Sequence, residues 1–228
     1  MTKCSVLLSG GLDSAVLLAE EAAAGPVQPI YVSAGLAWEQ AERIAVAAFL
    51  EALALPAVAA LAALTVDMQD VYPPTHWAIQ GRPPAYHTPD EDVYLPGRNI
   101  VLFGKAAILC AARGISRMAI GTLDHNPFPD ATPVFREALA RALSLGLAHT
   151  LTIDAPYARL SKAEVVRRGR RAGVPMALTL SCMNPILAKD IFPRHCGVCS
   201  KCRERHDAFV EAGVDDPTDY ADRQFVLA

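Results

Sequence analysis

The sequence predicts an α/β fold in which a parallel sheet is covered by helices on both faces. Apolar, strand-like runs alternate with helical stretches along the chain, which is typical of βαβ units. The length of 228 residues suits one globular domain with a small appendage. A composition that is 52% hydrophobic and only 20% charged excludes a disordered chain.

The amino-terminal half is expected to alternate strands and helices around an early glycine-rich turn. The expected elements are a strand at Cys4–Leu8, a helix at Ser14–Ala24, a strand at Pro29–Ala34, a helix at Trp38–Leu53 and a strand at Leu64–Met68. The alanine-rich residues 57–63 fit either kind of element. From Gln69 to Tyr94 the sequence is rich in proline, so we expect a long loop of the kind that often forms a lid.

The carboxy-terminal half continues the alternation and then changes character. The expected elements are a helix at Arg98–Arg113, a strand at Arg117–Gly121, a helix at Pro133–Leu145, a strand at Leu151–Asp154, a helix from Ser161 to Ala172 and a last helix at Cys199–Ala212. Ser161 and Glu164 have the spacing of a capping box. After Gly173 the sequence is irregular and rich in cysteine. We therefore expect an α/β domain at residues 1–175 and a small element at 176–228 packed on it.

The charge and the apolar runs exclude several classes of protein. Lys and Arg number 21 against 24 Asp and Glu, a net charge of -3, which does not favour a nucleic-acid partner. No apolar run approaches the roughly 20 residues that span a bilayer. The first residues lack the pattern of a signal peptide, so we expect a cytoplasmic protein, in which six cysteines need a role other than disulfides.

Residues 9–14, Ser-Gly-Gly-Leu-Asp-Ser, lie between the first strand and the first helix and are called the phosphate loop below. Glycines allow close backbone approach to a ligand, and a helix N-terminus offers amides and a positive dipole to an anion such as pyrophosphate. The spacing is neither that of a Walker loop nor that of Gly-x-Gly-x-x-Gly. The alternative is a tight turn in which Asp13 or Ser14 only caps the helix.

Four cysteines have the spacing of a metal site. Cys196, Cys199 and Cys202 follow one another at intervals of three, and Cys182 lies fourteen positions before the first of them. Four thiolates form a closed tetrahedral shell, typical of structural zinc, and an iron–sulfur cluster remains the alternative. His195 and His206 flank the run as substitute ligands. Cys4 and Cys110 are expected to be small buried hydrophobic residues.

The phosphate loop after a first strand resembles the signature of PP-loop ATP pyrophosphatases. Further segments resemble, in order, the 7-cyano-7-deazaguanine synthase family of these enzymes over most of the chain. They are Tyr94–Asn99, Lys162–Glu164, Ser181-Cys182 and the cysteine run with Arg205, together with Trp38-Glu39 and Asp215–Pro217.

This resemblance implies that ATP and ammonia convert 7-carboxy-7-deazaguanine, a small deazapurine carboxylate, into the nitrile through an adenylated carboxylate and an amide. It also implies Mg²⁺ beside the pyrophosphate and a structural Zn²⁺. The implied nucleotide contacts are Leu8, Ser9, Gly10, Gly11, Leu12, Asp13, Ser14, Val32 and Gly121. The implied catalytic residues are Asp13, Lys162 and Arg98, and the implied substrate contacts are Arg98, Asn99, Asp124, Phe128 and Asp130. For Arg98 and Asn99 a turn followed by a helix cap is the alternative, and for Lys162 an exposed position.

One segment departs from the family pattern. Where the family has Cys-Arg, in a loop at the carboxyl end of a strand, this chain has Ala131-Thr132. The change removes a cation from a place where ligands bind, and leaves open another carboxylate, a nucleotide or a protein as the acceptor.

Two further classes of function, and the possibility of a homodimer, remain compatible with the sequence. A tRNA-thiolating enzyme would need a basic surface, whereas the arginines at 167–171 are typical of a solvated helix face. A nucleotide-binding module without turnover is the other alternative. A homodimer is compatible with the sequence.

Overall fold

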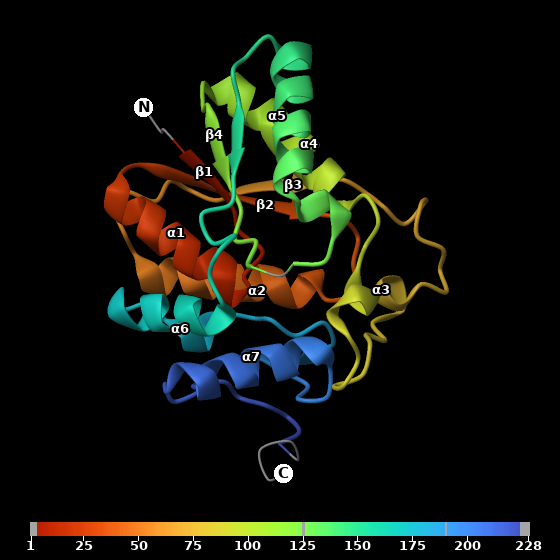
Figure 1. Cartoon of the computed structure of the whole chain (residues 1–228). Coiled ribbons are helices and arrows are strands. Elements are labelled where there is room, and N and C mark those ends of the chain that lie inside the picture. Colours follow the sequence, from red (N-terminus) through yellow and green to blue (C-terminus); the bar gives the residue numbers. More distant parts are fainter. Residues whose placement is uncertain (1–3, 125, 190, 224–228) are drawn as a thin grey trace.

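The computed structural model describes residues 4–124, 126–189 and 191–223, built around a five-stranded parallel sheet (Figure 1). The strand order is β3-β2-β1-β4-β5. The strands are β1 (Cys4–Leu7), β2 (Val27–Ser33), β3 (Ala62–Thr65), β4 (Arg117–Ala119) and β5 (Thr152–Asp154). Val6 of β1 pairs with Pro29 on one side and with Ala119 on the other. The α/β class with a parallel sheet is therefore confirmed.

Helices cover both faces of this sheet (Figure 1). They are α1 (Leu12–Ala24), α2 (Glu39–Leu53), α4 (Arg98–Arg113), α5 (Pro133–Leu147), α6 (Lys162–Arg171) and α7 (Ser200–Ala212), whereas the short helix α3 (Trp77–Gln80) lies beside the sheet. One core cluster joins β1 to α1, α2, α6 and α7 through side chains such as Val16, Phe49 and Phe209. A second cluster joins the opposite face to α4 and α5 through Phe103 and Ala140.

The expected long loop contains short helices and packs against other parts of the chain. Within Gln69 to Tyr94 the structure places α3 and the 3-10 helix η1 (Asp90–Val93). Tyr72 of this segment is buried in a third apolar cluster together with Trp38 and Met183 from outside it, which explains why the segment is ordered although its prolines interrupt regular structure. The expectation of one long loop was therefore wrong in part.

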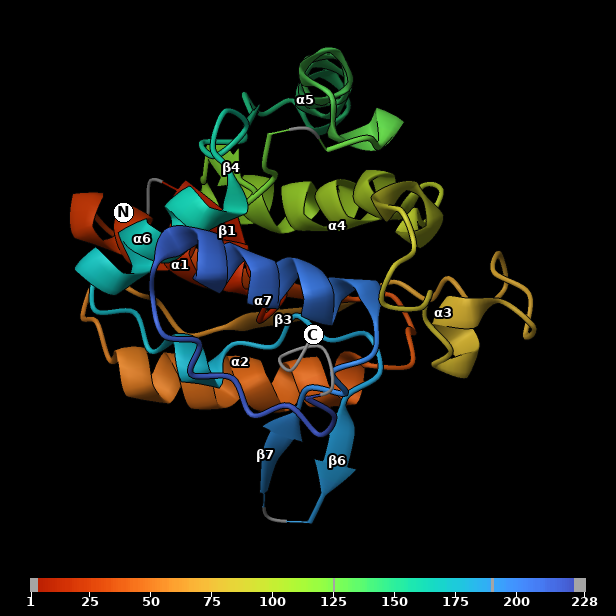
Figure 2. The same cartoon turned by 60° about the horizontal axis from the view of Figure 1, so that its bottom comes forward.

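Three other expectations needed correction. The third strand lies at Ala62–Thr65 rather than 64–68, because its residues pair with Ile30–Ser33 of β2. The segment after Gly173 is not wholly irregular, since β6 (Ile186–Ala188) and β7 (Ile191–Arg194) form an antiparallel hairpin. Figure 2 shows this hairpin projecting away from the sheet. The 3-10 helices η2 (Pro129–Ala131) and η3 (Met176–Leu178) were also not expected.

The carboxy-terminal element contacts the rest of the chain directly. Helix α7 packs on α6, and Leu180 N donates to the carbonyl oxygen of Gly10 at 2.7 Å. The hydroxyl of Ser161 caps α6 by accepting from Glu164 N at 3.2 Å, as the sequence predicts. Across the described residues no helix has the length and hydropathy needed to cross a membrane.

Candidate functional site

Two adjoining cavities open where β1, β2 and β4 end, with the phosphate loop in their shared wall. Their volumes are about 260 Å³ and about 320 Å³, and both are lined by Ser9, Gly11 and Asp13. The chain continues from β1 to β2 and β3 on one side of the sheet and then to β4 and β5 on the other side, so the strand order reverses at β1. In open α/β sheets ligands bind at such a switch point. The cavity of about 260 Å³ is called the first cavity below, and the cavity of about 320 Å³ the second cavity.

Glycines shape the phosphate loop for close contact. Gly10 has φ +81°, and a Cβ atom there would lie 3.1 Å from a methyl group of Val46. A Cβ atom on Gly121 would lie 3.1 Å from the backbone carbon of Asp13, so the end of β4 packs directly on the start of α1. Gly11 occupies the N-cap of α1 and offers no side-chain cap. The first turn of α1 thus presents its dipole to the cavities, which suits an anion.

A chain of alternating charges runs from the phosphate loop to the proline-rich segment. Lys162 Nζ donates to Asp13 Oδ2 at 3.0 Å and to Glu204 Oε1 at 2.8 Å. Lys201 Nζ donates to Glu204 Oε2 at 2.7 Å and to Asp90 Oδ1 at 3.4 Å. Asp13 Oδ1 is buried and has no hydrogen-bond partner among the described residues, and it is therefore the atom available to a ligand.

Burial and these ion pairs shift the pKa values of the three central groups. Burial raises the pKa of Asp13, although the cation of Lys162 opposes the change. Burial lowers the pKa of Lys162, but the attraction of Asp13 and Glu204 outweighs it and the net pKa is raised. Burial raises the pKa of Glu204, and the two lysines more than reverse this, to about 2. Lys162 therefore stays cationic at neutral pH.

A buried acid, Glu42 of α2, lines both cavities and was not foreseen from the sequence. Its carboxylate accepts from Tyr31 Oη at 2.9 Å and from Trp38 Nε1 at 3.0 Å. Burial raises the pKa of Glu42 to about 7, against the opposing charge of Arg98. The only sequence signal was an acid four positions after Trp38, on the apolar face of a helix.

The start of α4 supplies further side chains to the cavities. Arg98 lines both of them, and its Nε is buried without a hydrogen-bond partner among the described residues. Asn99 follows it and is bound to Asp130, which is 5% exposed. Phe128 stacks on Tyr94 with ring centroids 5.2 Å apart. The sequence pattern Pro-Gly-Arg-Asn is thus both a turn with a helix start and part of a cavity wall.

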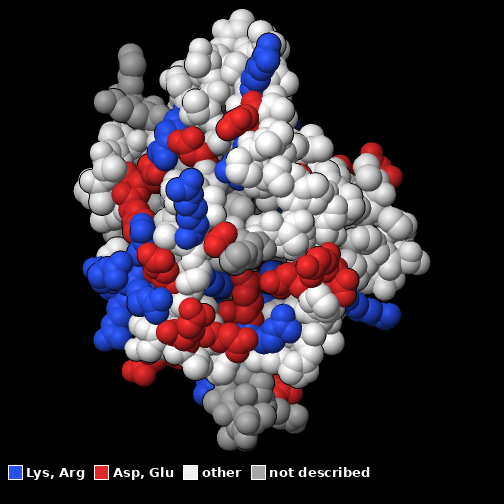
Figure 3. Space-filling view, in the orientation of Figure 1, with Lys and Arg blue, Asp and Glu red and all other residues white. Residues whose placement is uncertain are grey.

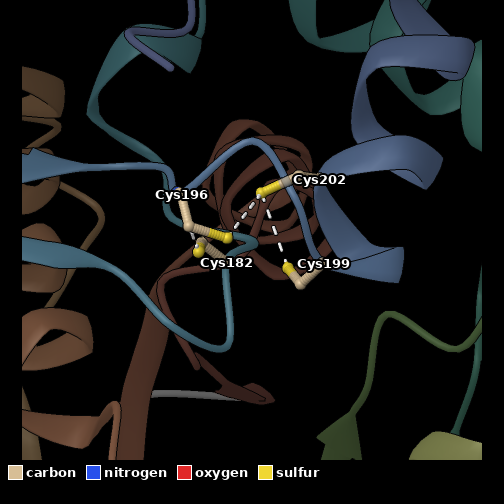
Figure 4. A group of neighbouring side chains, drawn as sticks. All are labelled: Cys182, Cys196, Cys199 and Cys202. Atoms are coloured by element: carbon tan, nitrogen blue, oxygen red, sulfur yellow. Dashed lines mark hydrogen bonds between the residues drawn. The ribbon is translucent and has the colours of Figure 1, made fainter. Parts of the chain in front are cut away.

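The four cysteines of the expected metal site converge in a buried cluster (Figure 4). The Sγ atoms of Cys182, Cys196, Cys199 and Cys202 all lie within 4.8 Å of one another. Backbone amides of Asn184 and Cys196 donate to Cys182 Sγ at 3.3 and 3.2 Å, which favours thiolate. Four thiolates at this spacing fit a tetrahedral metal ion.

The other candidate ligands lie outside the cluster. His195 Nε2 accepts from Ser181 N at 3.1 Å, so its ring is engaged elsewhere. His206 Nδ1 lies 3.4 Å from Asp207. Cys4 and Cys110 are buried in the two main core clusters, in agreement with the hydrophobic role expected for them. A metal ion in this part of the chain would thus be held by the four cysteines.

A fully buried arginine in α7, three residues after Cys202, binds the loops around the four-cysteine cluster. Arg205 of α7 donates to Thr218 Oγ1 at 2.6 Å, to Thr179 Oγ1 at 2.8 Å and to the carbonyl of Met176 at 2.8 Å. Thr218 in turn donates to Asp216, which also accepts from Tyr220 at 2.8 Å. These bonds fix α7 beside Leu180, whose amide reaches the phosphate loop.

Comparison with known proteins places the chain in a family. The sequence profile described as queuosine biosynthesis protein QueC matches residues 3–213. The chain belongs to the QueC family. A 7-cyano-7-deazaguanine synthase of Methanopyrus kandleri is 35% identical over 233 residues, which cover 96% of this chain and 99% of that protein. One of Xanthomonas campestris pv. campestris is 33% identical, covering 97% and 99% respectively.

A solved structure of low sequence identity also resembles this QueC-family chain. It comes from Methanocaldococcus jannaschii and is described as a predicted subunit of tRNA methyltransferase. The two are 16% identical and have a TM-score of 0.44, over 98% of this chain and 94% of that one. A score of this size carries no argument about function.

The structure of this QueC-family chain brings most of the expected site residues to the two cavities. The first is lined by Leu8, Ser9, Gly11, Asp13, Ser14, Val32, Arg98, Asn99, Gly121, Phe128 and Asp130, and the second by Ser9, Gly11, Leu12, Asp13, Arg98, Gly121, Asp124, Phe128 and Lys162. Gly10 lies behind the loop, against α2. Lys162 is largely buried rather than on an exposed face, while Asp124 N donates to Leu160 O. The neighbouring His125, which the sequence suggests is a loop contact rather than a catalytic base, lies outside the described residues.

The residues that depart from the family pattern have structural roles in this chain. Thr132 caps α5 by accepting from Phe135 N at 3.2 Å, and the carbonyl of Ala131 accepts from Arg136. Among the described residues, the linings of the two cavities include Asp130 but neither Ala131 nor Thr132. The departure therefore lies behind the cavity wall.

On the face drawn in Figure 3, basic side chains gather at the α6 end, with acidic side chains next to them. Arg168 lies 3.5 Å from Glu20 and 3.9 Å from Glu164. This mixture is typical of a solvated helix face, as the sequence predicts.

Proposed function

We propose that this chain is an ATP-dependent ligase that converts 7-carboxy-7-deazaguanine and ammonia into 7-cyano-7-deazaguanine. The observation that carries the proposal is the ion pair of Asp13 and Lys162 beside an anion-binding loop, where Asp13 lines both cavities and Lys162 lines the second. The acceptor carboxylate must attack the α-phosphorus of ATP opposite the leaving pyrophosphate, and two cavities that meet at this loop suit an arrangement with one reactant in each. Membership of the QueC family over residues 3–213 supports the choice of reactants.

The proposed chemistry activates a poor electrophile twice. A carboxylate oxygen attacks the α-phosphorus of ATP and releases pyrophosphate, which gives an acyl adenylate. Ammonia then adds to the acyl carbon, and AMP leaves with the formation of the amide. A second ATP adenylates the amide oxygen with release of pyrophosphate and one N–H proton, and loss of AMP and the other N–H proton forms the carbon–nitrogen triple bond. Each nitrile thus requires two ATP and one ammonia.

The residues of this chain serve these steps by charge and position. The first turn of α1 binds the pyrophosphate, and the cation of Lys162 stabilises the negative charge that develops on the phosphorus oxygens. Arg98, with its buried and unpartnered Nε, is placed to bind phosphate or carboxylate. Asp13 Oδ1 is the carboxylate oxygen suited to Mg²⁺, which would neutralise the pyrophosphate. We assign Asp124 and Phe128 to the wall facing the acceptor.

For the four-cysteine cluster we propose a structural zinc ion. All four donors are protein thiolates, so the shell is closed and leaves no position for a substrate. The ion would tie the loop at Cys182, which directly follows Leu180 and Ser181, to the start of α7. Its contribution is thus to the shape of the phosphate loop rather than to chemistry.

The experiment that tests the proposal follows release of AMP and pyrophosphate with ATP, Mg²⁺ and ammonium. The carboxylates offered are 7-carboxy-7-deazaguanine, its free nucleoside form and unrelated aromatic acids. We expect AMP and pyrophosphate in equal amounts, and only with 7-carboxy-7-deazaguanine. Release with another acid alone would replace the acceptor but keep the adenylating activity, and no release with any carboxylate would contradict the proposal.

A further inference from the structure

The pair Asn99 and Asp130 belongs to one cavity only. Among the described residues that line the cavities, both contribute to the first and neither to the second. The part of the wall that belongs to the first cavity alone is otherwise mostly apolar, with Ser14, Tyr31 and Tyr94 as its other described polar residues. It includes Leu7, Ile30, Val32, Leu102 and Ile120, from the strand ends and α4. Apolar side chains beside a fixed polar pair suit a purine base whose phosphates lie on the phosphate loop.

The hydrogen bonds of this pair fix which end of the Asn99 amide is available. Asn99 Nδ2 donates to the carbonyl of Asp130 at 3.1 Å and to its Oδ1 at 3.3 Å. The backbone amide of Asn99 donates to Asp130 Oδ2 at 3.2 Å. Both hydrogens of the side-chain NH₂ are thereby directed at Asp130. The side-chain carbonyl oxygen has no partner among the described residues and remains as an acceptor.

Neighbouring residues hold Asp130 in this place. It lies in η2, where Ala131 N donates to Phe128 O at 3.0 Å. The buried guanidinium of Arg136 donates to the carbonyl of Ala131, and Thr132 caps the helix that follows. The segment that departs from the family pattern thus anchors the carboxylate that orients Asn99.

We propose that the carbonyl oxygen of Asn99, oriented by Asp130, accepts a hydrogen bond from the exocyclic amino group of adenine and so selects ATP over GTP. Adenine presents an NH₂ donor where guanine presents a carbonyl acceptor, and a second acceptor facing that carbonyl would be left unpaired. The inference rests on the proposed use of ATP. On this inference Asn99 and Asp130 bind the nucleotide and not the acceptor. The acceptor then binds in the second cavity.

The test measures nucleotide binding without turnover. Binding of α,β-methylene-ATP and α,β-methylene-GTP with Mg²⁺ is compared by calorimetry for the full-length protein, Asp130→Asn and Asn99→Ala. In Asp130→Asn the Asn99 amide is no longer held in one orientation, so we expect the preference for the ATP analogue to fall by about tenfold, the loss of one well-placed hydrogen bond. Asn99→Ala should reduce it similarly. Asp92→Asn, an equal charge change on exposed η1, should leave the preference unchanged.

Inorganic pyrophosphate separates a specific effect from a general one. Its affinity for both variants should equal that of the wild type, because it contacts the phosphate loop and not the base pocket. An unchanged ATP preference, or a parallel loss of pyrophosphate binding, would overturn the inference. So would a loss of 7-carboxy-7-deazaguanine binding with the nucleotide preference intact. If the wild type forms no AMP, the proposed function is contradicted and not this inference, because the binding measurement needs no turnover.

Discussion

Lys162 and Asp13, which are 149 positions apart in the sequence, are joined by a 3.0 Å bond from Nζ to Oδ2, and Asp13 lines both cavities whereas Lys162 lines the second. The second oxygen of Asp13 is buried without a partner among the described residues. One ammonium group therefore joins the phosphate loop to α6 and, through Glu204, to α7.

Removal of either partner should stop adenylation while the fold persists. Asp13→Ala is expected to abolish AMP formation, and Lys162→Met to reduce it at least ~100-fold, as when a group that stabilises transition-state charge is lost. AMP is measured by chromatography and folding by circular dichroism. Glu164→Gln, in the first turn of the same helix, is the control and should retain activity. Wild-type rates in Asp13→Ala would refute the assignment of the phosphate loop.

Glu42 should make stability depend on pH. Because burial raises its pKa to about 7 from an ordinary value near 4.5, the folded state holds a proton that the unfolded state has lost between these limits. The stabilisation is complete below the unfolded pKa and is lost as the pH rises through 7. The free energy of unfolding of the wild type, relative to Glu42→Gln, should thus fall by up to ~3 kcal/mol between pH 4.5 and 7.5. Urea unfolding of both proteins at several pH values measures this, and parallel curves would contradict it.

The cysteine cluster should contain one zinc ion for each chain. Elemental analysis of protein purified without oxygen is expected to give one equivalent of zinc, and stoichiometric iron and sulfide would show a cluster instead. Cys199→Ser should lose the metal and unfold at a markedly lower temperature. Cys110→Ser, a change to a buried cysteine outside the cluster, should keep its zinc.

Arg205 should stabilise the fold through the hydrogen-bond geometry of its guanidinium as well as through its charge. Its guanidinium binds residues from two segments, Thr218 in one and Met176 and Thr179 in the other, and Lys cannot reproduce that geometry, so Arg205→Lys should destabilise the protein by ~3 kcal/mol. Arg203→Lys, two positions away on the more exposed side of α7 and bonded to the carbonyl of Thr88, should cost under ~1 kcal/mol. Denaturant unfolding compares them, and equal losses would show that the network contributes little.

Local sequence patterns predicted the sheet and most helices, because most strands are short apolar runs and most helices are bounded by glycine, proline or a capping residue. Helix α4 lies at Arg98–Arg113 as expected, since Gly97 precedes it and Gly114 ends it. The β6–β7 hairpin escaped prediction because Ile186 and Ile191 are exposed and form no alternating pattern.

The site was predictable where one motif or one spacing defines it, as with the phosphate loop and the four cysteines. Glu42 was missed because its function depends on Tyr31 and Trp38, which only folding brings around it. For the same reason no local pattern separated the two cavities, and only the structure shows that Asn99 lines the first and not the second.

The central claim is tested most directly by mass spectrometry of a reaction with 7-carboxy-7-deazaguanine, ATP, Mg²⁺ and ¹⁵N-ammonium. AMP, the amide and the nitrile are followed together in one time course. The account predicts a nitrile that carries one ¹⁵N, an amide that rises and then falls, and two AMP for each nitrile. AMP without any nitrogen-labelled product, or no AMP at all, would contradict it.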